Sequence, residues 1–306
     1  MNEAEQFRAA ARQRVAVHGR PGVGTGAVLA ALRALDRFDV SDVDVDVTVR
    51  VVAETVKPED VQAVMAAAGP VLVVLTKADT HPLGRGGPVE TARRRCDALA
   101  EVAGAPVVPM VGLLAVAALD PSVLDDELMR AVRTLAVEPA DLRTADAFLS
   151  CAHGLPVGVR RQLIEKLDLF GIAHAVVAVR NHPAATVDDV RAALRRAGDL
   201  DVVIDLITDL GAEGRYRRLR AALATLELAA ITDRSVAGLL HSDEVILTRM
   251  AAATQVLCAA GAPIGPVEHV ERARHWQRYG QGPVSAVHRA CAADLTAGSL
   301  LLWSSR

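Results

Sequence analysis

The residues with the most suggestive chemistry form a glycine-rich segment near the start of the chain. Residues 15–28 (VAVHGRPGVGTGAV) pass from an apolar stretch through four glycines into a region of helical periodicity. This order of strand, loop and helix suits phosphate binding, because N–H groups at the start of a helix hold phosphate oxygens. The phosphate-binding pattern G-x-x-x-x-G-K-[ST] also needs a lysine for charge and a hydroxyl for magnesium. The eight positions here are Gly19, Arg20, Pro21, Gly22, Val23, Gly24, Thr25 and Gly26, so threonine replaces the lysine and glycine replaces the hydroxyl residue.

A second candidate segment follows an apolar run at residues 71–75, which predicts a buried parallel strand. The next residues, Thr76, Lys77, Ala78 and Asp79, place a cation and a carboxylate at the end of that strand. Taken alone, this is an ordinary exit from a strand, with a solvated lysine and aspartate. Because the segment follows a glycine-rich loop, we interpret it as the second half of a nucleotide site.

The two segments together resemble the GTPase domains of the translation-factor-related P-loop class, and more narrowly the dynamin-like proteins of high-GC bacteria. The resemblance covers residues 10–140 and rests on the glycine loop, the TKAD sequence and the strand VVPMVGLLA. It implies that TKAD is the guanine-specifying [NT]KxD element and that residues 111–113 form a short loop beside the base. The nucleotide-binding positions that it implies are Gly19, Gly22, Gly24, Thr25, Gly26, Thr76, Lys77 and Asp79. GTP or GDP would be the ligand, and the residues leave open whether either binds.

The chain between the two segments is too short for a complete GTPase site. Predicted helices at 27–38 and 58–68 and a strand at 46–53 use most of it, and only the acidic tract 39–44 is left. The resemblance implies a magnesium-binding switch threonine and a DxxG turn in this region, and no DxxG occurs before Thr76. Phosphoryl transfer depends on positioning and positive charge. We therefore expect no GTP hydrolysis by the chain alone and assign no catalytic residue.

The composition narrows the other classes of function. With 306 residues, 51% of them hydrophobic, and a mean hydropathy of +0.26, the chain can bury a large core. A net charge of −3 gives no basic face for nucleic acid. The cysteines and histidines lack metal-ligand spacing, so no metal site is predicted, and Cys96 and Cys258 are expected to be buried thiols. The N-terminus lacks a signal sequence and no stretch suits a membrane span, which favours a cytoplasmic protein.

The predicted fold class is α/β, with a reduced GTPase-like parallel sheet and flanking helices followed by a mostly helical region. The domains expected are 1–140, the GTPase-like domain with degenerate nucleotide motifs, and 141–306, the helical domain. Within the helical domain we predict a helix that ends at Gly171 and a capping box at Thr186. Residues 172–183 are rich in valine, which favours a strand, and in alanine, which favours a helix. We interpret them as helical.

Two functions of different classes remain. The first is a non-catalytic GTPase-like protein that binds a partner protein, for which the resemblance suggests an intact dynamin-like GTPase. The alternative is a reduced GTP-binding protein whose catalytic residues come from a partner in trans. Neither predicts a nucleic-acid partner, and the oligomeric state stays open. Cys151 and His153 are a poor nucleophile and base pair, and the apolar segment 300–303 is expected to pack back on the fold.

Overall fold

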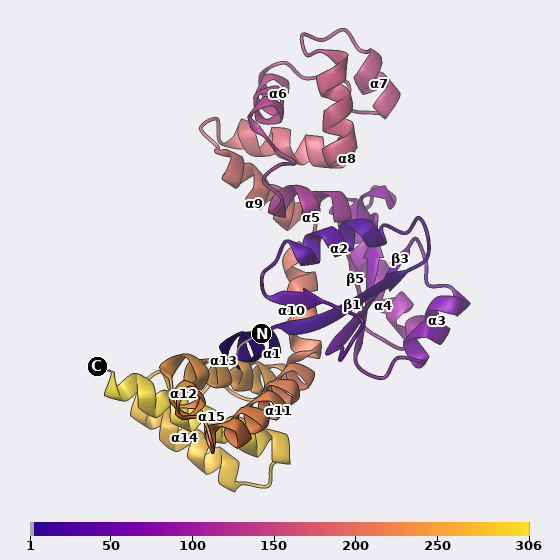
Figure 1. The fold of residues 1–306 in the computed structure, drawn as a ribbon. Coiled ribbons are helices and arrows are strands. Elements are labelled where there is room, and N and C mark those ends of the chain that lie inside the picture. Colours follow the sequence, from indigo (N-terminus) through magenta and orange to yellow (C-terminus); the bar gives the residue numbers. More distant parts are fainter. Residues whose placement is uncertain (1–2, 306) are drawn as a thin grey trace. The chain divides into compact units, whose positions relative to one another are not determined.

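The computed structural model describes residues 3–305, and Figure 1 gives the order of its elements. The contacts divide the chain into two compact units. The α/β unit comprises Val17–Asp36 and Thr48–Asp205, and the helical unit comprises Met1–Ala16, Arg37–Val47 and Leu206–Arg306. This grouping differs from the division at residue 140, since residues 141–205 belong to the α/β unit.

Five parallel strands form one sheet in the order β2-β1-β3-β4-β5. Their bounds are β1 Gln13–Gly19, β2 Phe38–Val40, β3 Val47–Ala53, β4 Val71–Thr76 and β5 Val107–Pro109. The parallel pairing of β3 with β4 runs from Thr48 opposite Val71 to Ala53 opposite Thr76. Every residue of β4 is buried, as its continuous apolar run predicts for a strand covered on both faces. The α/β class is therefore confirmed. The three-residue strand β2, which overlaps the start of the acidic tract, was not predicted.

The helices next to the sheet begin and end at residues with clear local signals. They are α2 Thr25–Arg33, α3 Pro58–Met65, α4 Pro88–Ala103 and α5 Gly112–Leu119. Proline occupies the first turn of α3 and of α4, where its missing N–H has no intrahelical role, and left-handed Gly104 ends α4. The prediction of a short loop at residues 111–113 is wrong: α5 begins at Gly112, so of these three residues only Val111 lies outside the helix. An added Cβ on Gly112 would lie 2.9 Å from the Ala27 methyl group, so α5 packs closely on α2.

Residues 112–205 of the α/β unit are mostly helical. Their remaining helices are α6 Asp126–Val137, α7 Ala145–Ser150, α8 Val157–Asn181, α9 Val187–Ala197 and α10 Leu200–Leu210, which continues into the helical unit. In Figure 1, α6 and α7 lie beside α8. The end predicted at Gly171 is wrong: α8 continues through Gly171, and its break lies at Asp168, where φ is 55°. The helix predicted after it is confirmed through Asn181, and so is the Thr186 capping box.

The helical unit has its own core. Its helices are α1 Glu3–Ala11, α11 Ala212–Ala230, α12 Arg234–Leu240, α13 Asp243–Ala259, α14 His269–Gln281 and α15 Ala286–Ser304. Tyr216 and Trp276 are buried in this core, and the Tyr216 hydroxyl donates to buried Asp294 at 2.6 Å. Cys258, predicted to be buried, is exposed. Trp303, expected to pack back on the fold, lies on α15 with 56% of its surface exposed.

Among residues 3–305, no helix is both long enough and apolar enough to cross a membrane.

Candidate functional site

The sequence-predicted residues meet at the carboxyl edge of the sheet. In the strand order, β1 lies between β2 and β3. The connection that follows β1 leads to the strand on one side of it, and the connection that follows β2 leads to the strand on the other side. In open parallel sheets a crevice forms outside the strand ends at such a switch point, and ligands bind there. The glycine loop, residues 20–24, follows β1, and Lys77 and Asp79 follow β4 at the same edge. The structure therefore brings together the two segments that the sequence paired.

The glycine loop has the backbone geometry of an anion-binding turn. Gly22 and Gly24 have φ of 82° and 89°, in the left-handed region that favours glycine. Gly24 precedes the first turn of α2, and its carbonyl accepts hydrogen bonds from Ala27 at 3.1 Å and Val28 at 3.3 Å. The first N–H groups of a helix lack intrahelical partners, and the helix dipole adds positive potential there. The loop therefore offers N–H donors, and Gly26 beyond it leaves the approach open.

Thr25 does not restore the charge of the missing lysine. An added Cβ on Gly19 would lie 2.3 Å from the Thr25 hydroxyl oxygen, so this side chain lies back against the start of the loop. Its hydroxyl oxygen is buried and has no hydrogen-bond partner among the described residues. A neutral, enclosed hydroxyl supplies neither a cation for phosphate nor an exposed ligand for magnesium.

Arg20, the one cation in the glycine loop, is held by carboxylates of α3. Its Nη2 lies 3.2 Å from Asp60 Oδ2, and its Nε lies 3.7 Å from Glu59. Asp60 is completely buried, and it also accepts from Arg50 Nη2 at 2.8 Å and from the Lys57 N–H at 3.1 Å. Burial opposes the charge of Asp60, but the Lys57 N–H, Arg50 and Arg20 outweigh it and keep the pKa of Asp60 below its usual value. The arginine charge is therefore already neutralised.

Thr76 connects the two halves of the site. It is 2% exposed, and its hydroxyl lies within hydrogen-bonding distance of the carbonyls of Val23, in the glycine loop, and Val52, at the end of β3, the latter at 3.0 Å. An added Cβ on Gly24 would lie 3.4 Å from the same hydroxyl oxygen. Thr76 therefore positions the glycine loop, and its hydroxyl is engaged by the protein.

Lys77 directly precedes a short 3₁₀ turn, η1 (Ala78–Thr80), and Asp79 lies within that turn. Lys77 is exposed and has a left-handed φ of 54°. Burial raises the pKa of Asp79, and the carboxylate of Asp168 raises it further, against the opposing effects of its own N–H, Lys77 and His81. A carboxylate that is partly desolvated gains from N–H donors.

Two residues that organise this edge were not predicted from the sequence. Asp60 and Arg50 belong to α3 and β3, and nothing in their spacing relates them to Arg20. The sequence offered one signal for Asp60: an acidic residue in the first turn of a helix that begins with proline. An acidic residue at such a position usually caps the helix.

The Cys151 and His153 pair has no arrangement for nucleophilic catalysis. Cys151 Sγ lies 3.3 Å from the Phe148 carbonyl. His153 Nε2 lies 2.8 Å from the Glu138 carbonyl, while Nδ1 accepts from the Leu155 N–H at 3.0 Å. Both imidazole nitrogens are therefore used in local structure. In the part of the chain that the structure describes, His, Cys, Asp and Glu side chains form no group of three or more that could hold a metal ion.

No family model matches this chain, and no curated protein or solved structure matches it.

Proposed function

We propose that this chain is a non-catalytic GTPase-like protein that binds a partner protein through the carboxyl edge of its sheet. This proposal rests on the resemblance of the glycine loop and TKAD to a GTPase nucleotide site, and on the position of both segments at one edge of the sheet. The partner class that follows from the resemblance is a related, intact dynamin-like GTPase.

One observation carries the non-catalytic part of this proposal: Arg20 is bound to Asp60 and Glu59. Catalysis of phosphoryl transfer relies on cations at the phosphates, and loss of one such group of the arginine-finger kind costs ~10³ to 10⁵ in rate. Here the lysine position holds Thr25, the magnesium-hydroxyl position holds Gly26, and the remaining cation faces α3. The absence of a DxxG sequence before Thr76 removes the element that senses the γ-phosphate.

The binding role is supported by apolar side chains at the same edge. Leu83, in the loop after TKAD, is 88% exposed, and Leu113, in the first turn of α5 after β5, is 40% exposed. Adjacent parallel strands β4 and β5 lead to these two residues. Apolar residues beside polar motif residues are typical of the mixed composition of protein interfaces.

A titration with a fluorescent guanine nucleotide tests the proposal against the alternative. The protein is titrated at low salt with magnesium, beside Asp79→Ala, with an adenine nucleotide as the competitor. We expect no saturable binding, which would exclude the alternative. Saturable binding that prefers GTP to ATP and is lost in Asp79→Ala would overturn the proposal in favour of a reduced GTP-binding protein.

That alternative has its own supporting observation. The left-handed Gly22 and Gly24 direct the loop so that the N–H groups of α2 remain available, and Asp79 is a desolvated acceptor. Such a protein would hold nucleotide through backbone groups and would take its catalytic charge from the partner.

A further inference from the structure

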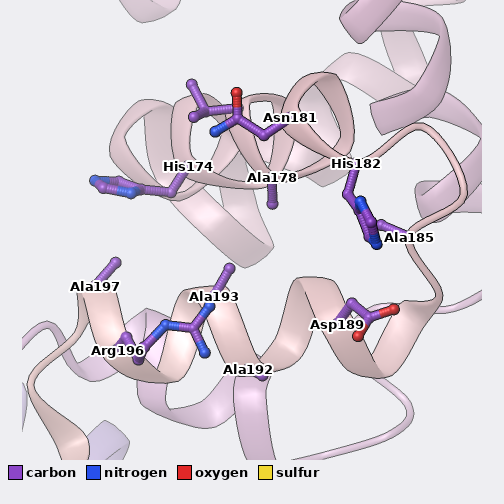
Figure 2. A pocket seen from close by; sticks show the side chains of 11 residues that line it. His174, Ala178, Asn181, His182, Ala185, Asp189, Ala192, Ala193, Arg196 and Ala197 are labelled. Carbon is purple, nitrogen blue, oxygen red and sulfur yellow. The ribbon is translucent and has the colours of Figure 1, made fainter.

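A groove between the second half of α8 and α9 is separate from the carboxyl edge of the sheet. It is open to solvent, and its volume of about 600 Å³ lies within the range of ~300 to 1,000 Å³ that is usual for small-molecule sites. Figure 2 shows Ala178 of α8 and Ala193 of α9 pointing into it from opposite sides. The helices contact each other, and their small side chains leave the space between them open. Val177, half-exposed, adds apolar surface to the same groove.

One end of the groove carries an unpaired positive charge. Arg191 and Arg195 of α9 are paired with Asp188 and Asp201 at 3.0 and 2.6 Å. The Arg196 side chain, in contrast, has no hydrogen bond or ion pair among the described residues, and it lines the groove. Figure 2 places His174 and Ala197 at the same end as Arg196. A guanidinium is permanently charged and presents several N–H donors to a carboxylate.

The other end of the groove is unsuited to a second anion. Asp189 lies there, beside His182, as Figure 2 shows. The carboxylate of Asp189 accepts from the N–H and the hydroxyl of Thr186, each at 2.8 Å. The backbone N–H and then the hydroxyl of Thr186 lower the pKa of Asp189, so it stays ionised at neutral pH. Asp189 and Arg196 are two helical turns apart, about 10 Å along α9 at ~1.5 Å per residue.

We propose that this groove binds an aliphatic monocarboxylate, with its carboxylate at Arg196 and its chain along Ala178 and Ala193. The charge of Arg196 selects the anionic end of the ligand, and the alanine and Val177 surfaces match an alkyl chain. Asp189 repels a second carboxylate at the far end. This site is independent of the function proposed above, because it shares no residue with the glycine loop or TKAD.

Octanoate is the probe for this proposal, used below its micelle concentration with the full chain. The alanine methyl groups are followed by NMR, with 1-octanol and octanedioate as comparison ligands. We expect saturable octanoate-dependent shifts at the Ala178 and Ala193 methyl groups. Octanol should bind more weakly because it lacks the charge, and octanedioate because Asp189 repels its second carboxylate.

Matched variants on one helix separate the site from a general effect of charge. Arg196→Gln should weaken octanoate binding about tenfold or more, as expected for loss of a charge-assisted hydrogen bond. Arg195→Gln, which alters an already paired neighbour, should leave binding unchanged. Both positions are on the surface of α9, and far-UV circular dichroism checks that the variants are folded. The absence of saturable shifts at the two methyl groups, or equal affinity of wild type and Arg196→Gln, would overturn the proposal.

Discussion

Replacing Asp60 by asparagine is expected to destabilise the α/β unit by about 2 to 3 kcal/mol. The carboxylate uses both oxygens: Oδ1 accepts from Arg50 Nε at 3.0 Å and Nη2 at 2.8 Å, and Oδ2 accepts from Lys57 N–H at 3.1 Å. Arg20 Nη2 lies 3.2 Å from Oδ2 as well. Asparagine has the same shape but only one acceptor oxygen, so it cannot serve all of these donors.

The magnitude follows from this set of donors. With its oxygen toward Arg50, asparagine keeps two bonds, which stay charge-assisted through the guanidinium, but each becomes weaker because the acceptor no longer carries a negative charge. Its amide then faces Lys57 N–H and Arg20, two donors that lose their acceptor at about 1 kcal/mol each. Arg50 and Arg20 side chains are 14% and 21% exposed, so water replaces part of the loss. The expected cost therefore stays below the ~3 to 5 kcal/mol of a fully enclosed pair.

Urea unfolding followed by far-UV circular dichroism measures this cost. Both tryptophans, Trp276 and Trp303, lie in the helical unit, so their fluorescence follows the unit that Asp60 does not belong to. The loss should therefore appear in the circular dichroism transition. Glu59→Gln is the matched control, because Glu59 is 53% exposed and contacts Arg20 at 3.7 Å, and it should cost no more than ~0.5 kcal/mol.

The pH dependence gives an independent check. Because the folded state lowers the pKa of Asp60, its stabilisation is fully present above the unfolded value, about 3.9. It is lost as the pH falls through the folded pKa. The difference between wild type and Asp60→Asn should therefore be constant from pH 5 to 7 and shrink below about pH 4. A cost within 0.5 kcal/mol of the Glu59→Gln control at pH 7 would refute the reasoning.

Five further substitutions, at four positions, test the local geometry by urea unfolding. Thr76→Val should cost ~1 to 3 kcal/mol, because it removes the buried hydroxyl that lies within hydrogen-bonding distance of two carbonyls. Thr76→Ser keeps the hydroxyl and should cost less. Gly24→Ala should destabilise the protein by ~1 to 2 kcal/mol, because φ at this position is 89°. Gly26→Ala, whose added methyl group would meet open space in the first turn of α2, should stabilise the protein by ~0.5 to 1 kcal/mol. Equal effects of the two substitutions would contradict this reasoning. Asp79→Asn should raise stability at pH 7, because burial and Asp168 disfavour the negative charge of Asp79. This gain should disappear as the pH falls below about 4, where Asp79 is protonated. A loss of stability at pH 7 would contradict the prediction.

The sequence predicted the α/β class because its strands carry strong local signals. The apolar run of β4 and the glycine turn before α2 needed no tertiary information. The break in α8 did not follow from its sequence: Gly171 reads as a stop, yet the helix continues there. An added Cβ at this glycine would lie 2.9 Å from Leu114, so the position serves close packing against α5. That contact depends on tertiary structure, which periodicity does not report.

The candidate site was predicted in part for the same reason. The glycine loop and TKAD are each a continuous stretch of chain that directly follows a strand. Because the strands are parallel, both segments lie at the same edge of the sheet, so their proximity follows from the order of the elements. The partners of Arg20 come from a helix more than one element away, and the pairing of Arg20, Arg50 and Asp60 needs the folded register. Charge pairing over such separations leaves no spacing pattern in a single sequence.

GTP turnover is the most direct test of the central claim that the site does not catalyse. Release of inorganic phosphate from GTP is measured for wild type and Asp79→Ala, with and without magnesium. The account predicts no release above the buffer rate in any of the four mixtures. Magnesium-dependent release by the wild type that disappears in Asp79→Ala would contradict it.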